Sequence, residues 1–176
     1  MSSVSGLLWQ DGRMPEEAIG KTGVPSTTRN KRERPRDPLG RPQPWDAPDA
    51  LEMPDFDALT VKENHELART YAHQGRWFHA HEAWETAWKK SKGTGDEELF
   101  KGLSQMGAGY VHLLRGNQHG AVTLLARAAR RLSSYPPGSH GVATADLAAR
   151  LEADIARIET GALVPGVDAA VQVITV

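Results

Sequence analysis

The sequence of 176 residues contains no cysteine. Disulfide bonds, thiolate zinc sites and cysteine nucleophiles are therefore excluded. No stretch approaches the roughly 18 apolar residues that a membrane-spanning helix needs, and residues 1–9 lack the basic start and apolar run of a signal peptide. A Gly-rich phosphate loop, a Gly-x-Ser-x-Gly turn and the Glu-x-x-His pairs of di-iron bundles are also missing. We therefore expect a cytoplasmic protein without a membrane partner.

The charges nearly balance, at a net −1, but they are segregated along the chain. Residues 51–98 carry six Lys/Arg against ten Asp/Glu, residues 99–145 carry five against none, and residues 146–176 carry two against five. Adjoining helices of opposite charge explain this pattern most simply. A basic face for nucleic acid is the weaker interpretation, because the arginines of 118–133 have no exposed aromatic residues between them. Nucleic acid is therefore not an expected partner.

Composition divides the chain into three parts. Residues 1–54 hold eight of the eleven prolines and show no apolar period, which predicts an extended or disordered arm that is basic and proline-rich. We expect Leu39 and Trp45 to anchor this arm on the rest of the protein as a strap, in preference to a basic tail on nucleic acid. Residues 55–160 are expected to form a helical domain. Residues 161–176 are expected to be a C-terminal tail, with a short strand at 171–174 as the less favoured alternative.

Apolar periodicity predicts five helices between residues 55 and 160. The first begins near Asp57 or Thr60, where Thr60 and Glu63 fit a capping box, and ends at Gly75. The others are expected at about 76–90, 96–115, 118–133 and 144–159, separated by Gly- and Pro-containing breakers. The predicted fold class is all-α, a compact bundle of about five helices.

Two segments 41 residues apart share one pattern. A glycine at position 75 or 116 is followed at offsets 5, 9 and 12 by alanine, a large apolar residue and alanine, namely Ala80, Trp84 and Ala87 or Ala121, Leu125 and Ala128. Small residues on one face let two helices approach closely, as in tetratricopeptide repeats, whose period is about 34. The pattern predicts two tetratricopeptide-like helical hairpins, with the fifth helix as a cap.

The helix expected at 76–90 carries three of the five tryptophans and the run HEAWE at 81–85. At about 100° per residue, His81 lies within the tryptophan stripe, Glu85 at its margin and Glu82 further out. His79 is expected to face solvent. His81 and Glu85 are one turn apart and can reach one point, as the ligands of H-E-x-x-H zinc sites do. A His and a Glu so placed suit Zn, Mn or Fe.

The helix expected at 96–115 carries a polar stripe edged by small residues, formed by Lys101, Gln105, Ala108 and His112. We expect this stripe to face His81 and Glu85. His112 is then the third candidate metal ligand, which a catalytic zinc site needs.

Two interpretations of these residues stay open. In the first, His81, Glu85 and His112 bind a metal, Glu82 and Glu85 act as catalytic acid and base, and Lys101 and Gln105 bind the ligand. In the second, the histidine and the glutamates form a buried network with Lys101 and Gln105 that fixes helix register. The histidines in polar or loop contexts are not expected to be functional, namely His65, His73, His119 and His140.

The run GRWFHAHEAWETAW at 75–88 resembles the hallmark G-x-[YF]-F-x-A-H-E-x-x-E-x-x-W of the bacterial family known as domain of unknown function 309. KGLSQ at 101–105 and HLLRGN at 112–117 resemble its second motif, and RPRD and GRP at 34–42 resemble the arm of actinobacterial members. The resemblance spans residues 34–133, with Trp77 as a departure from the usual pattern. It implies an all-α bundle of tetratricopeptide-like hairpins.

Some members of that family are labelled predicted metal-dependent hydrolases. The resemblance therefore implies a functional cluster of His81, Glu82, Glu85, Gln105 and His112, with a divalent metal (Zn, Mn or Fe) as the candidate cofactor. The alternative is a non-enzymatic helical interaction module. A small ligand, a protein partner and a second copy of the chain in a homodimer are the partners left open.

Overall fold

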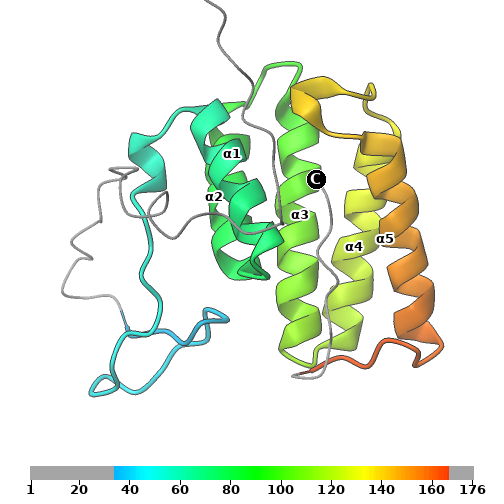
Figure 1. Cartoon of the computed structure of the whole chain (residues 1–176). Helices are drawn as coiled ribbons and strands as arrows, with labels where there is room; N and C mark the ends of the chain where they lie inside the picture. Colours follow the sequence, from blue (N-terminus) through cyan, green and yellow to red (C-terminus); the bar gives the residue numbers. More distant parts are fainter. Residues whose placement is uncertain (1–33, 167–176) are drawn as a thin grey trace, which may run out of the picture.

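The computed structural model describes residues 34–166. In chain order they form η2 (Phe56–Ala58), α1 (Val61–His73), α2 (Trp77–Lys90), α3 (Glu97–Leu114), α4 (Gln118–Ser133), η3 (Ser139–Gly141) and α5 (Thr144–Glu159) (Figure 1). Between residues 34 and 166 there is no strand, and Arg36 and Pro42 form an isolated antiparallel bridge. The predicted all-α class and its five helices are confirmed. The short strand considered at 171–174 lies outside the described residues.

Each helix packs on its neighbours in chain order, α1 on α2, α2 on α3, α3 on α4 and α4 on α5. α3 lies in the middle, between α2 on one side and α4 on the other (Figure 1). The helix bounds follow the expected ones closely because local signals set them. At the start of α1, for example, the Thr60 hydroxyl accepts a hydrogen bond from the Glu63 amide, and the Glu63 carboxylate accepts one from the Thr60 amide. None of the helices in the described part of the chain is both long and apolar enough to cross a membrane.

The two copies of the 41-residue pattern have the same local structure. Gly75 and Gly116 end α1 and α3 with φ angles of 71° and 79°, which glycine adopts without strain. The amide after each glycine bonds back to the carbonyl five residues earlier, at 2.8 and 2.9 Å. All six following pattern positions are fully buried, namely Ala80, Trp84, Ala87, Ala121, Leu125 and Ala128. The pattern thus places equivalent small residues in the interior of both hairpins.

Two hydrogen-bonded aromatic contacts fix α2 in the core. Trp77 packs on Tyr110, with ring centroids 4.4 Å apart, and the Tyr110 hydroxyl donates to Oδ2 of the buried Asp154 at 2.8 Å. Trp84 is fully buried and its Nε1 donates to Nδ1 of His65 at 3.1 Å. Buried polar groups are costly unless they are paired, so the bond from Trp84 to His65 favours one rotation of α2.

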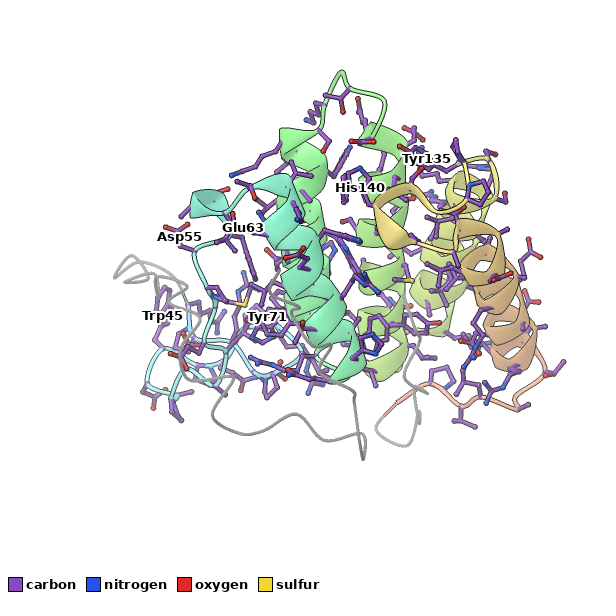
Figure 2. All side chains as sticks on the ribbon, turned by 45° about the horizontal axis from the view of Figure 1, so that its top comes forward. Trp45, Asp55, Glu63, Tyr71, Tyr135 and His140 are labelled. Atoms are coloured by element: carbon purple, nitrogen blue, oxygen red, sulfur yellow. The ribbon has the colours of Figure 1, made fainter. Side chains whose placement is uncertain are left out.

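His65 is a core residue, and the prediction that it lies in a polar context was wrong. Its side chain is buried between α1, α2 and η3, and its Nε2 lies 3.1 Å from the carbonyl oxygen of His140, at the connection between α4 and α5 (Figure 2). Since Nδ1 accepts from Trp84, Nε2 carries the proton and donates. The pattern of α1 concealed this role because its buried face also includes the polar Asn64.

Residues 36–42 form a tight turn that lies on α2 and α3, which we call the docked turn. Asp37 holds it together, because its Oδ1 accepts from the amides of Leu39 and Arg41 at 3.0 and 2.8 Å. Gly40 has a φ of 76°, and a Cβ atom there would lie 2.1 Å from the ring of Phe78. Only glycine fits this contact with α2.

Two expectations about this part of the chain were wrong. Trp45 is 66% exposed on the outer loop (Figure 2) and is not buried against the described helices, whereas Leu51 is the buried apolar residue of that segment. His79 is only 4% exposed and does not face solvent. Its Nε2 lies 3.0 Å from the Glu52 carbonyl oxygen, because the chain before η2 covers this side of α2.

The buried His65 predicts acid sensitivity. Burial lowers its pKa from 6.5 to about 4, so below pH 6.5 the unfolded chain takes up a proton that the folded protein does not. The free energy of unfolding should therefore fall by up to about 1.4 kcal/mol per pH unit between pH 6.5 and 4 from this residue, and not above pH 7. Urea denaturation of the wild type and of His65→Gln across this range measures it.

At pH 7 the wild type should have a larger free energy of unfolding than His65→Gln. This difference should become smaller as the pH falls from 7 to 4.5. The exposed His119→Gln is the matched control and should follow the wild type throughout. A gap that stays constant with pH contradicts the assignment of a neutral, buried His65.

Candidate functional site

The candidate site lies where α2 and α3 approach most closely. A Cβ atom at Gly107 would lie 2.9 Å from the Cα atom and 3.0 Å from the backbone nitrogen of His81, so the two backbones are almost in contact. Two other glycines of α3, Gly102 and Gly109, face Leu132 and Leu125 of α4 instead. Gly107 alone among these three glycines brings His81 onto α3.

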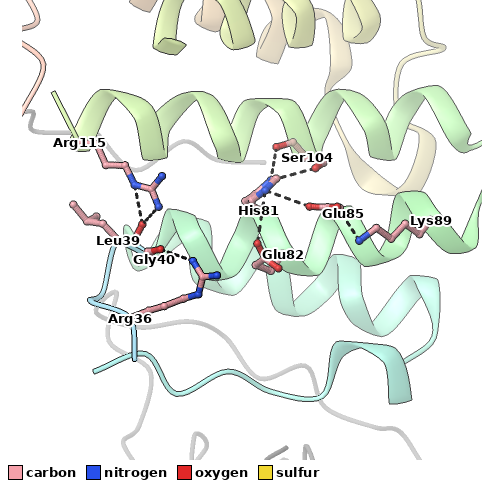
Figure 3. A network of polar contacts seen from close by, with 9 residues as sticks. All are labelled: Arg36, Leu39, Gly40, His81, Glu82, Glu85, Lys89, Ser104 and Arg115. Atoms are coloured by element: carbon pink, nitrogen blue, oxygen red, sulfur yellow. Dashed lines mark hydrogen bonds and ion pairs between the residues drawn. The ribbon is translucent and has the colours of Figure 1, made fainter. Parts of the chain in front are cut away.

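His81 is oriented by the backbone of α3. Its Nδ1 lies 3.0 Å from the carbonyl oxygen of Ser104 and 3.3 Å from the Ser104 hydroxyl oxygen (Figure 3). A carbonyl oxygen only accepts, so Nδ1 carries a proton and donates it there. In a neutral imidazole this leaves the lone pair on Nε2, which points away from α3.

Two carboxylates from α2 meet Nε2 of His81. It lies 3.4 Å from Oε2 of Glu85 and 3.8 Å from Oε1 of Glu82. One ligand atom from each of the three residues lies within 4.8 Å of those of the other two. The side chains are half-buried, with 21% exposure for His81, 28% for Glu85 and 38% for Glu82. The group therefore has a protein side and a solvent side.

The two glutamates differ in their surroundings. Burial raises the pKa of Glu82, and the charge of Glu85 raises it further, whereas the charges of His81, Lys89 and Arg36 lower it. Glu85 is paired, because its Oε1 accepts a hydrogen bond from Nζ of Lys89 at 2.8 Å. That bond is also the main cause of the raised pKa of Lys89. Glu82 is thus the carboxylate that gains more from a bound cation.

The polar side chains of the α3 stripe do not all contact the group of His81, Glu82 and Glu85. Nδ1 of His112 lies 2.9 Å from Nδ2 of Asn117, and His112 is outside the three-residue group found in the described part of the chain. Oε1 of Gln105 accepts from Nε of Arg131 in α4 at 3.1 Å. Nζ of Lys101 lies 5.2 Å from the ring centre of Trp88.

The stripe is divided because α3 is packed on both sides. α2 covers one side of it and α4 the other, so positions one turn apart along the stripe contact different helices. Burial lowers the pKa of His112, and so do the charges of Arg115 and His81, which places His112 near the group although it is not part of it.

Sequence reasoning missed the two α3 residues that contact His81 directly. Ser104 acts through its backbone carbonyl, which no side-chain motif reveals, and Gly107 acts by lacking a side chain. Their spacing of three residues on a helix was the available clue, because it places both on one face. Ser104 also lies inside the KGLSQ run.

The geometry of the group fits a small divalent cation. Ligand atoms about 2.0–2.2 Å from a tetrahedral zinc ion lie roughly 3.3–3.6 Å from one another. The distance from His81 to Glu85 is 3.4 Å, within this range, and the distance from His81 to Glu82 is 3.8 Å, slightly above it. A metal-binding imidazole typically donates its other N–H to a carbonyl or carboxylate, as His81 does to Ser104. The exposed side of the group leaves room for water or a further ligand.

The fold and the site define a class of all-helical proteins with one histidine and two glutamates on the second of five helices, where it packs on the third. Residues 66–124 match the family described as Domain of unknown function (DUF309). The match runs from within α1 to within α4 and supports the family resemblance over these residues. No curated protein and no solved structure matches the chain.

Gly107→Ala should destabilise the protein and disturb the site. The new methyl group would meet the backbone of His81 at 2.9 Å, so α2 and α3 must separate. Overpacking of this kind costs about 1–3 kcal/mol, partly offset by a gain of about 1 kcal/mol in helix propensity. We expect a net loss of about 1–2 kcal/mol in the free energy of unfolding, measured with urea.

Gly95→Ala is the matched control. Nothing lies within 4 Å of a Cβ atom at this position, so its effect should stay within about 0.5 kcal/mol. Equal stability of the two variants would mean that α2 and α3 are not held this closely.

Proposed function

We propose that His81, Glu82 and Glu85 bind a divalent metal ion of the zinc, manganese or iron type. The observation that carries this proposal is the Nδ1 contact with the Ser104 carbonyl at 3.0 Å, which leaves Nε2 facing two carboxylates. Imidazole and carboxylate ligands suit these metals. Among the candidate ligands named from the sequence, Glu82 takes the place that His112 was expected to fill.

The site supports hydrolysis as the reaction class. Three protein ligands with an open side are typical of catalytic zinc, which when bound lowers the pKa of a coordinated water. Glu85 is held by Lys89 and suits the role of a fixed ligand.

The second candidate function is a helical interaction module in which the cluster is structural. The ion pair between Lys89 and Glu85 favours it, because a protonated His81 between two carboxylates would complete a charge network without a metal. The network expected from the sequence also included Lys101 and Gln105. In the described structure Lys101 lies over the ring of Trp88 and Gln105 accepts a hydrogen bond from Arg131.

Zinc titration of metal-free protein without an affinity tag tests the proposal. His81→Ala removes the only neutral ligand, so zinc affinity should fall by about 100-fold or more. This is roughly what one ligand contributes to the binding free energy of a zinc site. Glu82→Gln and Glu85→Gln should each weaken binding, and the matched control His112→Ala should not. Isothermal titration calorimetry measures all four.

Two results would contradict the metal proposal. The metal proposal is rejected if the purified wild-type protein binds no stoichiometric metal. Unchanged zinc affinity in His81→Ala would place the metal elsewhere, and a loss in His112→Ala equal to that in His81→Ala would restore His112 as a ligand in place of Glu82.

Lys89→Met separates the two candidate functions. Lys89 competes with a metal for Glu85, so its removal should strengthen zinc binding by about two- to fivefold, the value of an exposed ion pair. In the structural interpretation the same change only lowers stability. Lys62→Met removes the comparable exposed pair with Glu66 on α1 and should leave zinc affinity unchanged.

A further inference from the structure

The docked turn brings arginines to the edge of the His81 cluster. Nη1 of Arg36 donates to the carbonyl of Gly40 at 2.8 Å, and Nε of Arg115, at the end of α3, donates to the carbonyl of Leu39 at 3.0 Å. The two guanidinium groups therefore hold consecutive carbonyl oxygens, and both lie on the Glu82 side of the site (Figure 3).

Both arginines keep donors that are not used within the described residues. Arg115 places Nε and Nη2 on the Leu39 carbonyl, which leaves Nη1. The guanidinium of Arg36 places Nη1 on Gly40, which leaves Nε and Nη2. Arg36 is exposed and Arg115 is half-buried, so a ligand can reach these donors from solvent.

The charges around the docked turn do not balance. Arg41 is paired with Asp37, the carboxylate that holds the turn together. Burial lowers the pKa of Arg115, and the charges of Arg41 and Arg36 lower it further against the opposing charge of Asp37. Within residues 34–166 neither Arg36 nor Arg115 is in an ion pair, although Glu82 lies near enough to Arg36, and Asp37 near enough to Arg115, for their charges to interact.

The aromatic ring of Phe78 also holds Arg115 in place. Its guanidinium carbon lies 5.9 Å from the ring centre of Phe78, and the same ring packs against Gly40. Phe78 therefore supports both Arg115 and the turn that carries Arg36. A site whose charged groups are fixed before the ligand arrives loses less entropy on binding.

We propose that Arg36 and Arg115 bind the phosphate group of a small phosphorylated molecule beside His81, Glu82 and Glu85. Planar guanidinium groups match the oxygens of phosphate in pairs, and two of them balance a dianion, which a carboxylate is not. This inference rests on the proposed metal site for its place in a reaction, since it names the class of substrate that the site would take. Phosphate binding itself needs only the arginines.

Titration of the full-length, metal-free protein with inorganic phosphate at constant ionic strength tests the inference. Arg36→Gln should weaken phosphate binding by about tenfold or more, since hydrogen bonds between charged groups are the strong ones. Arg36 is exposed, so this variant should keep its fold. Arg127→Gln on α4, also exposed, is the matched control and should bind like the wild type.

Two further arms of the experiment sharpen the result. Arg115→Lys keeps the charge but loses the paired donors, so it should also bind phosphate more weakly. Gly40→Ala should undock the turn, because its Cβ atom would lie 2.1 Å from Phe78, and should weaken phosphate as much as Arg36→Gln does. Acetate in place of phosphate should bind at least tenfold more weakly.

Three outcomes overturn the inference. They are phosphate affinity unchanged in Arg36→Gln, an equal loss in Arg127→Gln, and acetate binding as tight as phosphate binding. Its failure is distinct from that of the metal site. Zinc binding with no effect of Arg36→Gln on phosphate rejects the phosphate site alone, whereas phosphate binding that depends on Arg36 in a protein that takes no metal rejects the metal site alone.

Discussion

The candidate site depends on the contact between Gly107 and the backbone of His81. A Cβ atom at position 107 of α3 would lie 2.9 Å from the Cα atom of His81 in α2. Any side chain there would therefore push the two helices apart. Because the backbones are so close, Nδ1 of His81 reaches the Ser104 carbonyl and its Nε2 is aimed at Glu82 and Glu85. One missing methyl group therefore determines the direction of the imidazole, which a motif of side chains cannot express.

The rotation of α2 is fixed by one hydrogen bond and one aromatic contact that lie away from the site. The indole N–H of Trp84 donates to His65 of α1, and Trp77 packs on Tyr110, which is bonded to Asp154 of α5. Rotating α2 would leave the indole N–H of Trp84 without its partner, at a cost of about 1–3 kcal/mol, and would also break the packing of Trp77 on Tyr110. The core thus holds the His81 side of the helix at a half-exposed edge, where ligand atoms are ordered and solvent is still within reach.

The helices could be predicted from the sequence because their limits are local. Thr60 and Glu63 cap α1, and Gly75 and Gly116 end α1 and α3 with backbone angles that favour glycine. The pairing of His81 with Glu85 is local too, since it joins residues one turn apart. The predictions failed where residues far apart in the chain meet, as when the segment before η2 covers His79 or when α4 binds Gln105. Periodicity gives the face of a helix but not the neighbour that covers it.

The segment around residues 36–42 shows how composition can conceal a specific structure. Its prolines and arginines predict a loose arm, yet Asp37 closes the turn, Gly40 fits against Phe78 and Arg115 holds the Leu39 carbonyl. Each of these contacts needs one particular residue type, and together they place positive charge beside a group of two carboxylates. Carboxylates attract a metal ion and guanidinium groups attract an anion, so the two charge types do not compete for one ligand. Their juxtaposition suits a ligand that carries a phosphate group and has a second oxygen within reach of a cation.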